Sequence, residues 1–268
     1  MNYTVNQSRI HYTANGPRVF GENISLLQQA IDLTAKTSWA GQGFSIEKVF
    51  THQLYQDFSE KARLLLIRSW RKAGLSIPDD FMLERFHTLI PSWKMHLHIL
   101  EKTKLLPASE FPVDANLIVK RISEICNEEL IAKNPFDNQS IFHFRVIRPG
   151  SHDNNPLHRD VWLEDYKDCI NLYIPLAGSN ELSSLILIPG SHHWPESKVE
   201  KTIGGAEING VKFNVPAVTA ITGDYQAIRP NPALNEVLIF SPYLIHGGAA
   251  NLNQDKTRIS IEMRLWKK

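Results

Sequence analysis

The stretch TRISIEMRLW, residues 257–266, alternates polar and apolar side chains along its length. Successive side chains of a β-strand point to opposite faces, so the pattern predicts a strand with one charged and one apolar face. The polar face carries Arg258, Ser260, Glu262 and Arg264. On a surface strand these groups would meet water. In the wall of a barrel they would line the interior.

A second stretch, INLYIPL at residues 170–176, favours the barrel. Asn171 and Tyr173 alternate there with Ile170, Leu172 and Ile174. If helices cover the apolar outer faces of both strands, the polar faces line a cavity, and polar cavities of this kind hold ligands.

The rest of the chain divides near Pro135 into a helix-rich part and a strand-rich part. Before this residue, apolar residues recur at helical spacing. After it, short apolar runs lie between turn residues. The predicted helices are residues 24–36, 55–75, 80–90 and 115–132, and the predicted strands are 141–150, 169–178, 183–191, 235–242 and 257–266.

This order predicts an α+β, mainly β fold. About eight short strands without helical crossovers are typical of a jelly roll, with the N-terminal helices packed on its outer face. No flexible linker separates the parts, so we expect a single domain over residues 1–268, helix-rich over about 1–135 and with a jelly-roll core over about 136–268.

Composition excludes several classes of function. The 29 Lys and Arg residues balance 28 Asp and Glu residues, so no overall charge attracts nucleic acid or an anionic membrane. Cys126 and Cys169 lack the spacing of a disulfide framework or a zinc site, and we expect buried free thiols. The N-terminal residues do not resemble a signal peptide and no long apolar run occurs, so we expect a cytoplasmic protein.

A candidate metal site lies in PLHRDVW, residues 156–162. His158 and Asp160 are two apart, so on an extended chain they point the same way. His246, in SPYLIHGG, ends an apolar run and is a third candidate, although it could be a plain loop residue. Two histidines and one carboxylate form the facial arrangement that favours Fe(II) and leaves coordination positions open. A closed zinc site would need a fourth protein ligand, while an open catalytic zinc site remains compatible.

The ordered set of motifs resembles the phytanoyl-CoA dioxygenase family of Fe(II)/2-oxoglutarate-dependent oxygenases. The resemblance covers about residues 141–266. It rests on these motifs, in chain order: His158-x-Asp160, ILIPGSHHW at 186–194, His246-Gly-Gly, Asn251 and Arg258-x-Ser260.

The resemblance implies a double-stranded β-helix, or cupin-like jelly roll, in which His158, Asp160 and His246 bind iron. It also implies that Arg258 pairs with the distal carboxylate of 2-oxoglutarate and that Ser260 is a second contact. A planar, permanently charged guanidinium suits that role. The alternative partner for Arg258 is Glu262 on the same face.

Four further residues are weaker candidates. Asn171 and Tyr173 could reach the cosubstrate or could have structural hydrogen bonds. Arg145 lies on the strand before the metal motif and could contact the substrate. Trp162 follows the motif, and its ring could line the substrate pocket or pack in the hydrophobic core.

These features predict an enzyme that uses Fe(II), 2-oxoglutarate and O2 to hydroxylate an unactivated C–H bond of a small metabolite or natural-product intermediate, with release of succinate and CO2. Three alternatives remain open: a cupin-like isomerase or dioxygenase without 2-oxoglutarate, a zinc-dependent hydrolase, and a non-catalytic binding module. The sequence carries no feature that selects the substrate or the oligomeric state.

Overall fold

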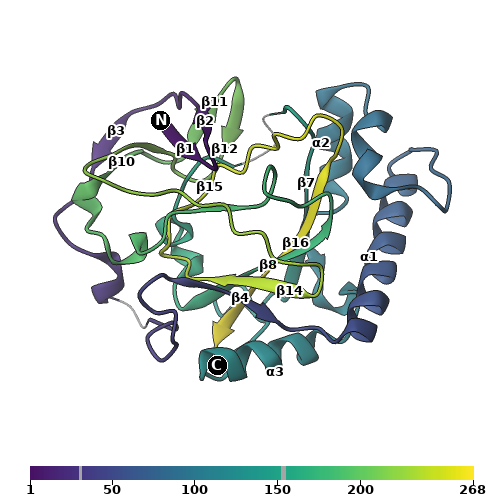
Figure 1. Cartoon of the computed structure of the whole chain (residues 1–268), viewed down its shortest axis with the longest axis horizontal. Helices are drawn as coiled ribbons and strands as arrows, with labels where there is room; N and C mark the ends of the chain where they lie inside the picture. Colours follow the sequence, from purple (N-terminus) through teal and green to yellow (C-terminus); the bar gives the residue numbers. More distant parts are fainter. Residues whose placement is uncertain (30–31, 152–154) are drawn as a thin grey trace.

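A computed structural model describes residues 1–29, 32–151 and 155–268 of the chain. Its central feature is a seven-stranded, antiparallel main sheet (Figure 1). In spatial order the main sheet contains β4 (Phe44–Lys48), β14 (Glu236–Phe240), β8 (Cys169–Ala177), β16 (Arg258–Lys267), β7 (Ile141–Ile147) and β5 (Leu106–Pro107), with β6 (Leu130–Ile131) also paired to β16.

Short strands form a second layer across from the main sheet. The strands are β1 (Asn2–Val5) with β2 (Ser8–His11), β3 (Arg18–Phe20) with β10 (Val199–Thr202) and β13 (Val218–Ile221), β11 (Ala206–Ile208) with β12 (Val211–Phe213), and β9 (Ile186–Leu187) with β15 (His246–Gly247). The two layers give the predicted double-stranded β-helix. Within the described residues it is open, so the polar strand faces line a pocket between layers and not the interior of a closed barrel.

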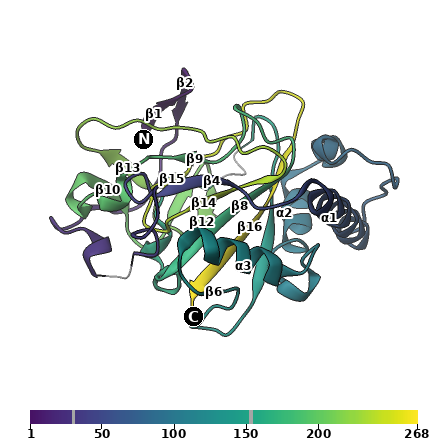
Figure 2. The same ribbon diagram turned by 60° about the horizontal axis from the view of Figure 1, so that its bottom comes forward.

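In the described part of the chain, three α-helices pack around the main sheet: α1 (His52–Lys72), α2 (Trp93–Glu101) and α3 (Ala115–Cys126). Figure 2 shows α3 lying along the sheet, with α1 to one side. Each helix begins at a side-chain cap, because the oxygens of Thr51, Ser92 and Asp114 accept hydrogen bonds from the first backbone N–H groups.

One large hydrophobic core joins the helices to one face of the main sheet. Phe58 and Leu66 of α1 and Ile118 of α3 pack in the same cluster as Ile170 of β8 and Ile261 of β16. The apolar residues of β16 therefore face the helices, as predicted, and its polar residues face the second layer.

The predicted helix over residues 24–36 is mostly wrong. Only a short 3-10 turn, Leu26–Gln29, forms before residues 30 and 31, which lie outside the described part of the chain. The side chain of Asp32 accepts hydrogen bonds from the backbone N–H and the hydroxyl of Thr34, at 2.8 and 2.7 Å. Such a local turn competes with helix formation.

The predicted helix over residues 80–90 is a 3-10 helix, Leu83–Leu89. Its backbone groups form hydrogen bonds with the residue before β16. The carbonyl of Glu84 accepts from the N–H of Thr257 at 2.8 Å, and the N–H of His87 donates to the Thr257 hydroxyl at 3.1 Å. The N-terminal strands β1 to β4 and helix α2 were not predicted.

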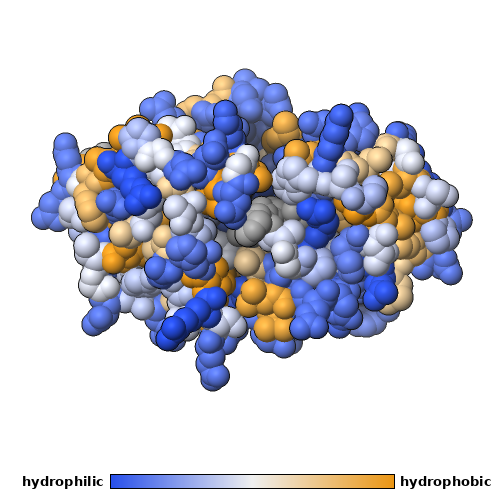
Figure 3. All heavy atoms as spheres, turned by 90° about the horizontal axis from the view of Figure 1, so that it is seen from above, coloured by the Kyte–Doolittle hydropathy of each residue, from blue (hydrophilic) through white to orange (hydrophobic). Residues whose placement is uncertain are grey.

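The predicted helix over residues 115–132 ends at Cys126, and Leu130–Ile131 forms β6 instead. Only residues 186 and 187 of the predicted strand 183–191 form a strand, β9. The prediction for the two cysteines is confirmed. Cys126 and Cys169 are buried free thiols. Among the described residues, no helix has both the length and the apolar character needed to cross a membrane. The surface seen from above in Figure 3 is mainly hydrophilic, with apolar side chains in small groups.

Candidate metal centre

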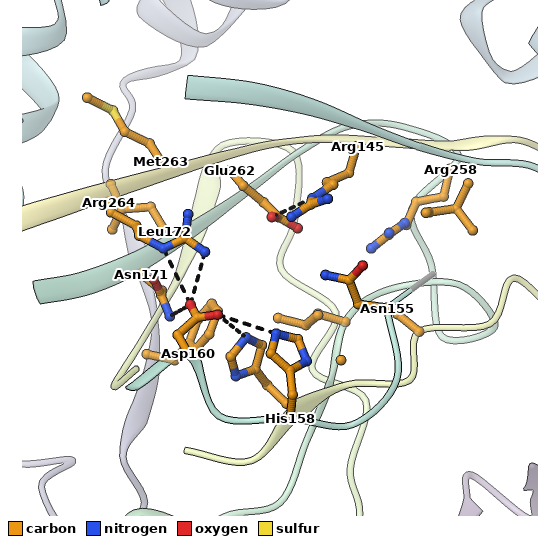
Figure 4. Close-up of a pocket in the computed structure, with 16 residues that line it drawn as sticks. Arg145, Asn155, His158, Asp160, Asn171, Leu172, Arg258, Glu262, Met263 and Arg264 are labelled. Carbon is orange, nitrogen blue, oxygen red and sulfur yellow. Dashed lines mark hydrogen bonds and ion pairs between the residues drawn. The ribbon is translucent and has the colours of Figure 1, made fainter. Parts of the chain in front are cut away.

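The three predicted metal ligands come together at one buried point. His158, Asp160 and His246 each offer a ligand atom, and these atoms all lie within 4.8 Å of one another. Oδ1 of Asp160 lies 3.3 Å from Nε2 of His158 and 3.7 Å from Nε2 of His246. All three residues line one pocket between the two layers (Figure 4).

Backbone pairing fixes the two histidines opposite each other. The N–H of His158 donates to the carbonyl of His246 at 2.8 Å, and the reverse hydrogen bond is 2.9 Å long. Gly247 permits this approach, because a Cβ there would collide with the carbonyl oxygen of Pro156 and lie 2.9 Å from Nδ1 of His158. Its φ of +105° also suits glycine alone. The glycine after His246 is therefore part of the site's geometry.

Asp160 reaches the same point because Arg159 between the ligands is extended, with φ −112° and ψ 136°. The alternation that sends His158 and Asp160 into the pocket sends Arg159 to the opposite side. There its guanidinium, buried from solvent, forms an ion pair with Glu196 at 2.5 Å and donates to the carbonyl of Ser191 at 2.7 Å. This pair ties the metal motif to the ILIPGSHHW segment.

The hydrogen bonds of both histidines leave Nε2 available as a ligand. Nδ1 of His158 lies 2.8 Å from the carbonyl of Pro156, and Nδ1 of His246 lies 2.9 Å from the carbonyl of Leu244. A carbonyl only accepts, so each Nδ1 carries a hydrogen, and each Nε2 is the ring atom left to bind a metal. Burial, reinforced by the neighbouring His158, lowers the pKa of His246 to about 4, so this ring is neutral at physiological pH.

Asp160 is ionised despite its burial. Burial by itself raises the pKa of this carboxyl, but neighbouring groups, above all the charge of Arg264, outweigh it and hold the pKa well below its usual range. Two imidazoles that each offer Nε2, together with one carboxylate, are the donor set that suits Fe(II) with open positions.

Arg258 lines the pocket, and Ser260 lies two residues further along on the same face of β16. They are 2% and 0% exposed, and Nε and Nη1 of Arg258 and the hydroxyl of Ser260 have no hydrogen-bond partner among the described residues. The alternative partner, Glu262, bonds instead to Nε of Arg145 at 2.7 Å. Buried donors without partners are costly, so this corner of the pocket fits an anion with several oxygens.

The remaining predicted residues take different positions. Nδ2 of Asn171 donates to Asp160 at 2.9 Å, and the hydroxyl of Tyr173 bonds to Ser179 at 2.7 Å while its ring lies beside Arg258. Arg145 lines the pocket. Trp162 does not line it; its indole N–H donates to Glu196 at 2.9 Å on the far side of the metal motif.

Among the residues that line the pocket, the sequence assigned no role to Arg264 and Asn155, and it offered Glu262 only as the alternative partner of Arg258. Nη2 of Arg264 lies 3.0 Å from Asp160. The alternation of residues 257–266 puts Arg264 and Glu262 on the polar face, but their partners lie 104 and 117 residues away in the chain. No local signal in the sequence identifies such partners.

Asn251, quoted as part of the motif set, has a structural role. Its side-chain amide donates to the carbonyls of Ile147 and Lys256, at 2.9 and 2.7 Å, and its carbonyl oxygen accepts from the N–H of Asn253. These bonds fix the loop that connects His246 to Arg258.

The fold and the pocket define a class, the cupin-like double-stranded β-helix oxygenases that use Fe(II), 2-oxoglutarate and O2. Residues 94–260, more than half of the chain, match the family model described as phytanoyl-CoA dioxygenase (PhyH). The chain belongs to this family, and this membership defines it as an Fe(II)/2-oxoglutarate-dependent oxygenase in the broad sense. No relative was found among the curated proteins.

Two solved structures share the fold. One is EctD from S. alaskensis, solved with 2-oxoglutarate and 5-hydroxyectoine, at 14% identity and a TM-score of 0.56, with 96% of this chain and 86% of that chain covered. The other is ThoJ, described as a non-heme monooxygenase in its apo form, at 13% identity and a TM-score of 0.50, with 88% and 77% covered.

Proposed function

We propose that the chain hydroxylates an unactivated C–H bond of a small metabolite or natural-product intermediate. In this reaction the substrate, 2-oxoglutarate and O2 become the hydroxylated product, succinate and CO2. The observation that carries the proposal is a buried His158–Asp160–His246 cluster in one pocket with Arg258. Among the described residues, Nε and Nη1 of Arg258 and the nearby hydroxyl of Ser260 have no hydrogen-bond partner.

In the proposed site, Nε2 of His158, Nε2 of His246 and Oδ1 of Asp160 hold Fe(II). The iron and its cosubstrate, when bound, supply the oxidising power for the C–H bond. Three protein ligands leave positions open for the cosubstrate and O2.

Arg258 binds the distal carboxylate of 2-oxoglutarate, with Ser260 as a second donor. Burial strengthens this charge-assisted contact, since water does not compete for the guanidinium. Tyr173 supports Arg258 through its ring face, 5.6 Å from the guanidinium carbon. Asn171 contributes through Asp160 and not through the cosubstrate.

The substrate occupies the part of the pocket bounded by Arg145 and Glu262. Their side chains are 29% and 21% exposed, whereas Asp160 and both histidines are 7% exposed or less. In Figure 4 this pair lies across the cavity from His158. A molecule entering the pocket therefore meets an ion pair that can both donate and accept hydrogen bonds.

The test is succinate formation from 2-oxoglutarate by the purified protein with Fe(II) and ascorbate under air, with and without pooled cell metabolites. We expect iron-dependent succinate that rises with one metabolite fraction. In Arg258→Met, the dissociation constant for 2-oxoglutarate should rise by at least about tenfold, since one charge-assisted contact is lost. Activity that persists without O2, or an Arg258→Met variant that binds 2-oxoglutarate normally, would overturn the proposal.

A further inference from the structure

The two oxygens of the Asp160 carboxylate have different surroundings. Oδ2 accepts hydrogen bonds from Nδ2 of Asn171 at 2.9 Å and from Nη2 and Nε of Arg264 at 3.0 and 3.4 Å. Oδ1 faces Nε2 of both histidines. Figure 4 shows these contacts converging on the carboxylate, with Arg264 and Asn171 on the side away from His158.

The two donors come from neighbouring strands of the main sheet. Arg264 on β16 and Asn171 on β8 are direct cross-strand partners in the antiparallel register. Side chains opposite each other on one face of a sheet lie about 5 Å apart, close enough to share one acceptor. The strand register therefore aims both donors at Oδ2, while Asp160 itself lies outside the sheet at the start of a 3-10 helix, Asp160–Trp162.

Arg264 is held firmly in this position. Its side chain is 14% exposed, and its guanidinium carbon lies 4.2 Å from the centre of the Tyr166 ring. A cation stacked on an aromatic face gains a further electrostatic attraction. A planar guanidinium fixed on one side fixes the direction of the carboxylate on the other side.

We infer that Arg264 is a positioning residue: with Asn171 it occupies Oδ2 of Asp160 and leaves Oδ1 as the single carboxylate oxygen for the metal. This inference rests on the proposed metal-binding role of His158, Asp160 and His246. A carboxylate held by one oxygen uses one coordination position, so the remaining positions stay open for a chelating cosubstrate.

Arg264 also sets the charge of the centre. Its positive charge cancels that of Asp160, so a divalent ion bound there keeps its full charge for the dianion 2-oxoglutarate. Loss of the unit charge beside Asp160, at the effective dielectric constant of a protein site, should weaken binding of that anion by about tenfold or more.

The experiment uses the Co(II)-loaded protein and two readouts that do not depend on turnover. The Co(II) absorption spectrum reports the coordination geometry, and titration with 2-oxoglutarate reports its dissociation constant. In Arg264→Met we expect a changed Co(II) spectrum and a dissociation constant raised about tenfold or more. Arg264→Lys restores the charge and one donor, so it should bring the dissociation constant back to within about threefold of the wild-type value.

Arg121→Met is the matched control, because this arginine forms an exposed ion pair with Glu124 on α3. It should match the wild type in both readouts. If Arg264→Met does not fold, as judged by circular dichroism, Arg264→Gln replaces it with the same expected result. An uncharged variant at residue 264 that folds and keeps both the wild-type spectrum and the wild-type dissociation constant refutes the positioning role.

His158→Ala separates this inference from the proposed function. If His158→Ala binds Co(II) as well as the wild type does, the proposed metal site itself is wrong. If His158→Ala loses Co(II) while Arg264→Met matches the wild type, only the positioning role of Arg264 is wrong.

Discussion

At the scale of single residues, hydrogen bonds decide which atoms of the pocket remain free. The carbonyls of Pro156 and Leu244 hold Nδ1 of the two histidines, and this leaves both Nε2 atoms facing Asp160. Glu262 bonds to Arg145, and Nε and Nη1 of Arg258 therefore have no hydrogen-bond partner within the described part of the chain. Each free atom is a buried polar group that a ligand would satisfy.

Replacement of Asp160 by Ala tests the metal site directly. The variant loses the only carboxylate among the three proposed ligands, so we expect Co(II) affinity to fall by more than about 100-fold and succinate formation to stop. Isothermal titration with Co(II) and the succinate assay measure both effects. Asp165→Ala, at an exposed carboxylate five residues away, is the control and should match the wild type. Normal Co(II) binding by Asp160→Ala would contradict the assignment.

The lowered pKa of His192 predicts that the free energy of unfolding depends on pH in the acid range. Its Nε2 donates to the carbonyl of Ala40 at 2.8 Å, and burial lowers its pKa to about 4 from about 6.5. Between these pH values the unfolded chain holds more protons than the folded one, so stability falls as the pH drops from about 6.5 to about 4.

His192→Gln tests this dependence, because the glutamine amide can still donate to Ala40 but does not titrate. Urea unfolding at pH 7 and pH 5 should show a smaller loss of stability in this variant than in the wild type. His98→Gln, at an exposed position on α2, should retain the wild-type loss. Equal losses in His192→Gln and the wild type would remove His192 as a cause.

At the scale of elements, the pairing of β8 and β16 organises the site. Their register sets Asn171 opposite Arg264 and Tyr173 opposite Glu262, with an irregularity between Ile259 and Ser260. Alternation along β16 was predictable from residues 257–266, because a period of two is visible locally. The 3-10 helix at residues 83–89 was not predictable, because its backbone hydrogen bonds to Thr257 depend on a strand that is distant in the sequence.

A substitution at Gly178 tests whether the position of the start of β16 determines the affinity for 2-oxoglutarate. This residue follows β8 with φ +61°, and a Cβ there would collide with the backbone carbonyl of Thr257, the residue before Arg258. Gly178→Ala should displace the start of β16. We therefore expect 2-oxoglutarate affinity to fall more than Co(II) affinity, as measured by titration of both ligands.

Gly223→Ala separates collision from backbone strain. Gly223 has a similar φ of +74°, but a Cβ there would meet nothing within 4 Å. Gly223→Ala should lower the free energy of unfolding by only about 1 kcal/mol, the cost of an alanine in the left-handed conformation. It should leave the affinities for Co(II) and 2-oxoglutarate unchanged. If the two variants behave alike in 2-oxoglutarate binding, the collision with Thr257 does not position Arg258.

At the scale of the whole molecule, the candidate metal centre joins the two layers. His246 belongs to the second layer on β15 and His158 is bridged to it, whereas Asp160 is bound by Arg264 and Asn171 of the main sheet. A metal ion held by all three would connect the layers. The helices add the large core on the other face of the main sheet and contribute no side chain to the metal centre.

Metal should therefore stabilise the whole fold. A ligand that binds only the folded state adds about 2.7 kcal/mol of unfolding free energy at 100 times its dissociation constant. Thermal unfolding with Co(II) should show a raised melting temperature, which a chelator reverses. Asp160→Ala should show no rise. A rise of the same size in Asp160→Ala would mean that Co(II) binds elsewhere.

The sequence by itself determined a jelly roll, the order of the motifs and six of the residues that line the pocket: Arg145, His158, Asp160, Asn171, His246 and Arg258. These follow from side-chain alternation and from residue types at fixed spacing, both of which are local. Only the tertiary structure decided the pairing of charges. Arg145 pairs with Glu262 and Arg264 pairs with Asp160, whereas Arg258 pairs with neither of these two carboxylates. Ion pairs across more than 100 residues depend on strand register and loop packing, and these are set by the whole fold.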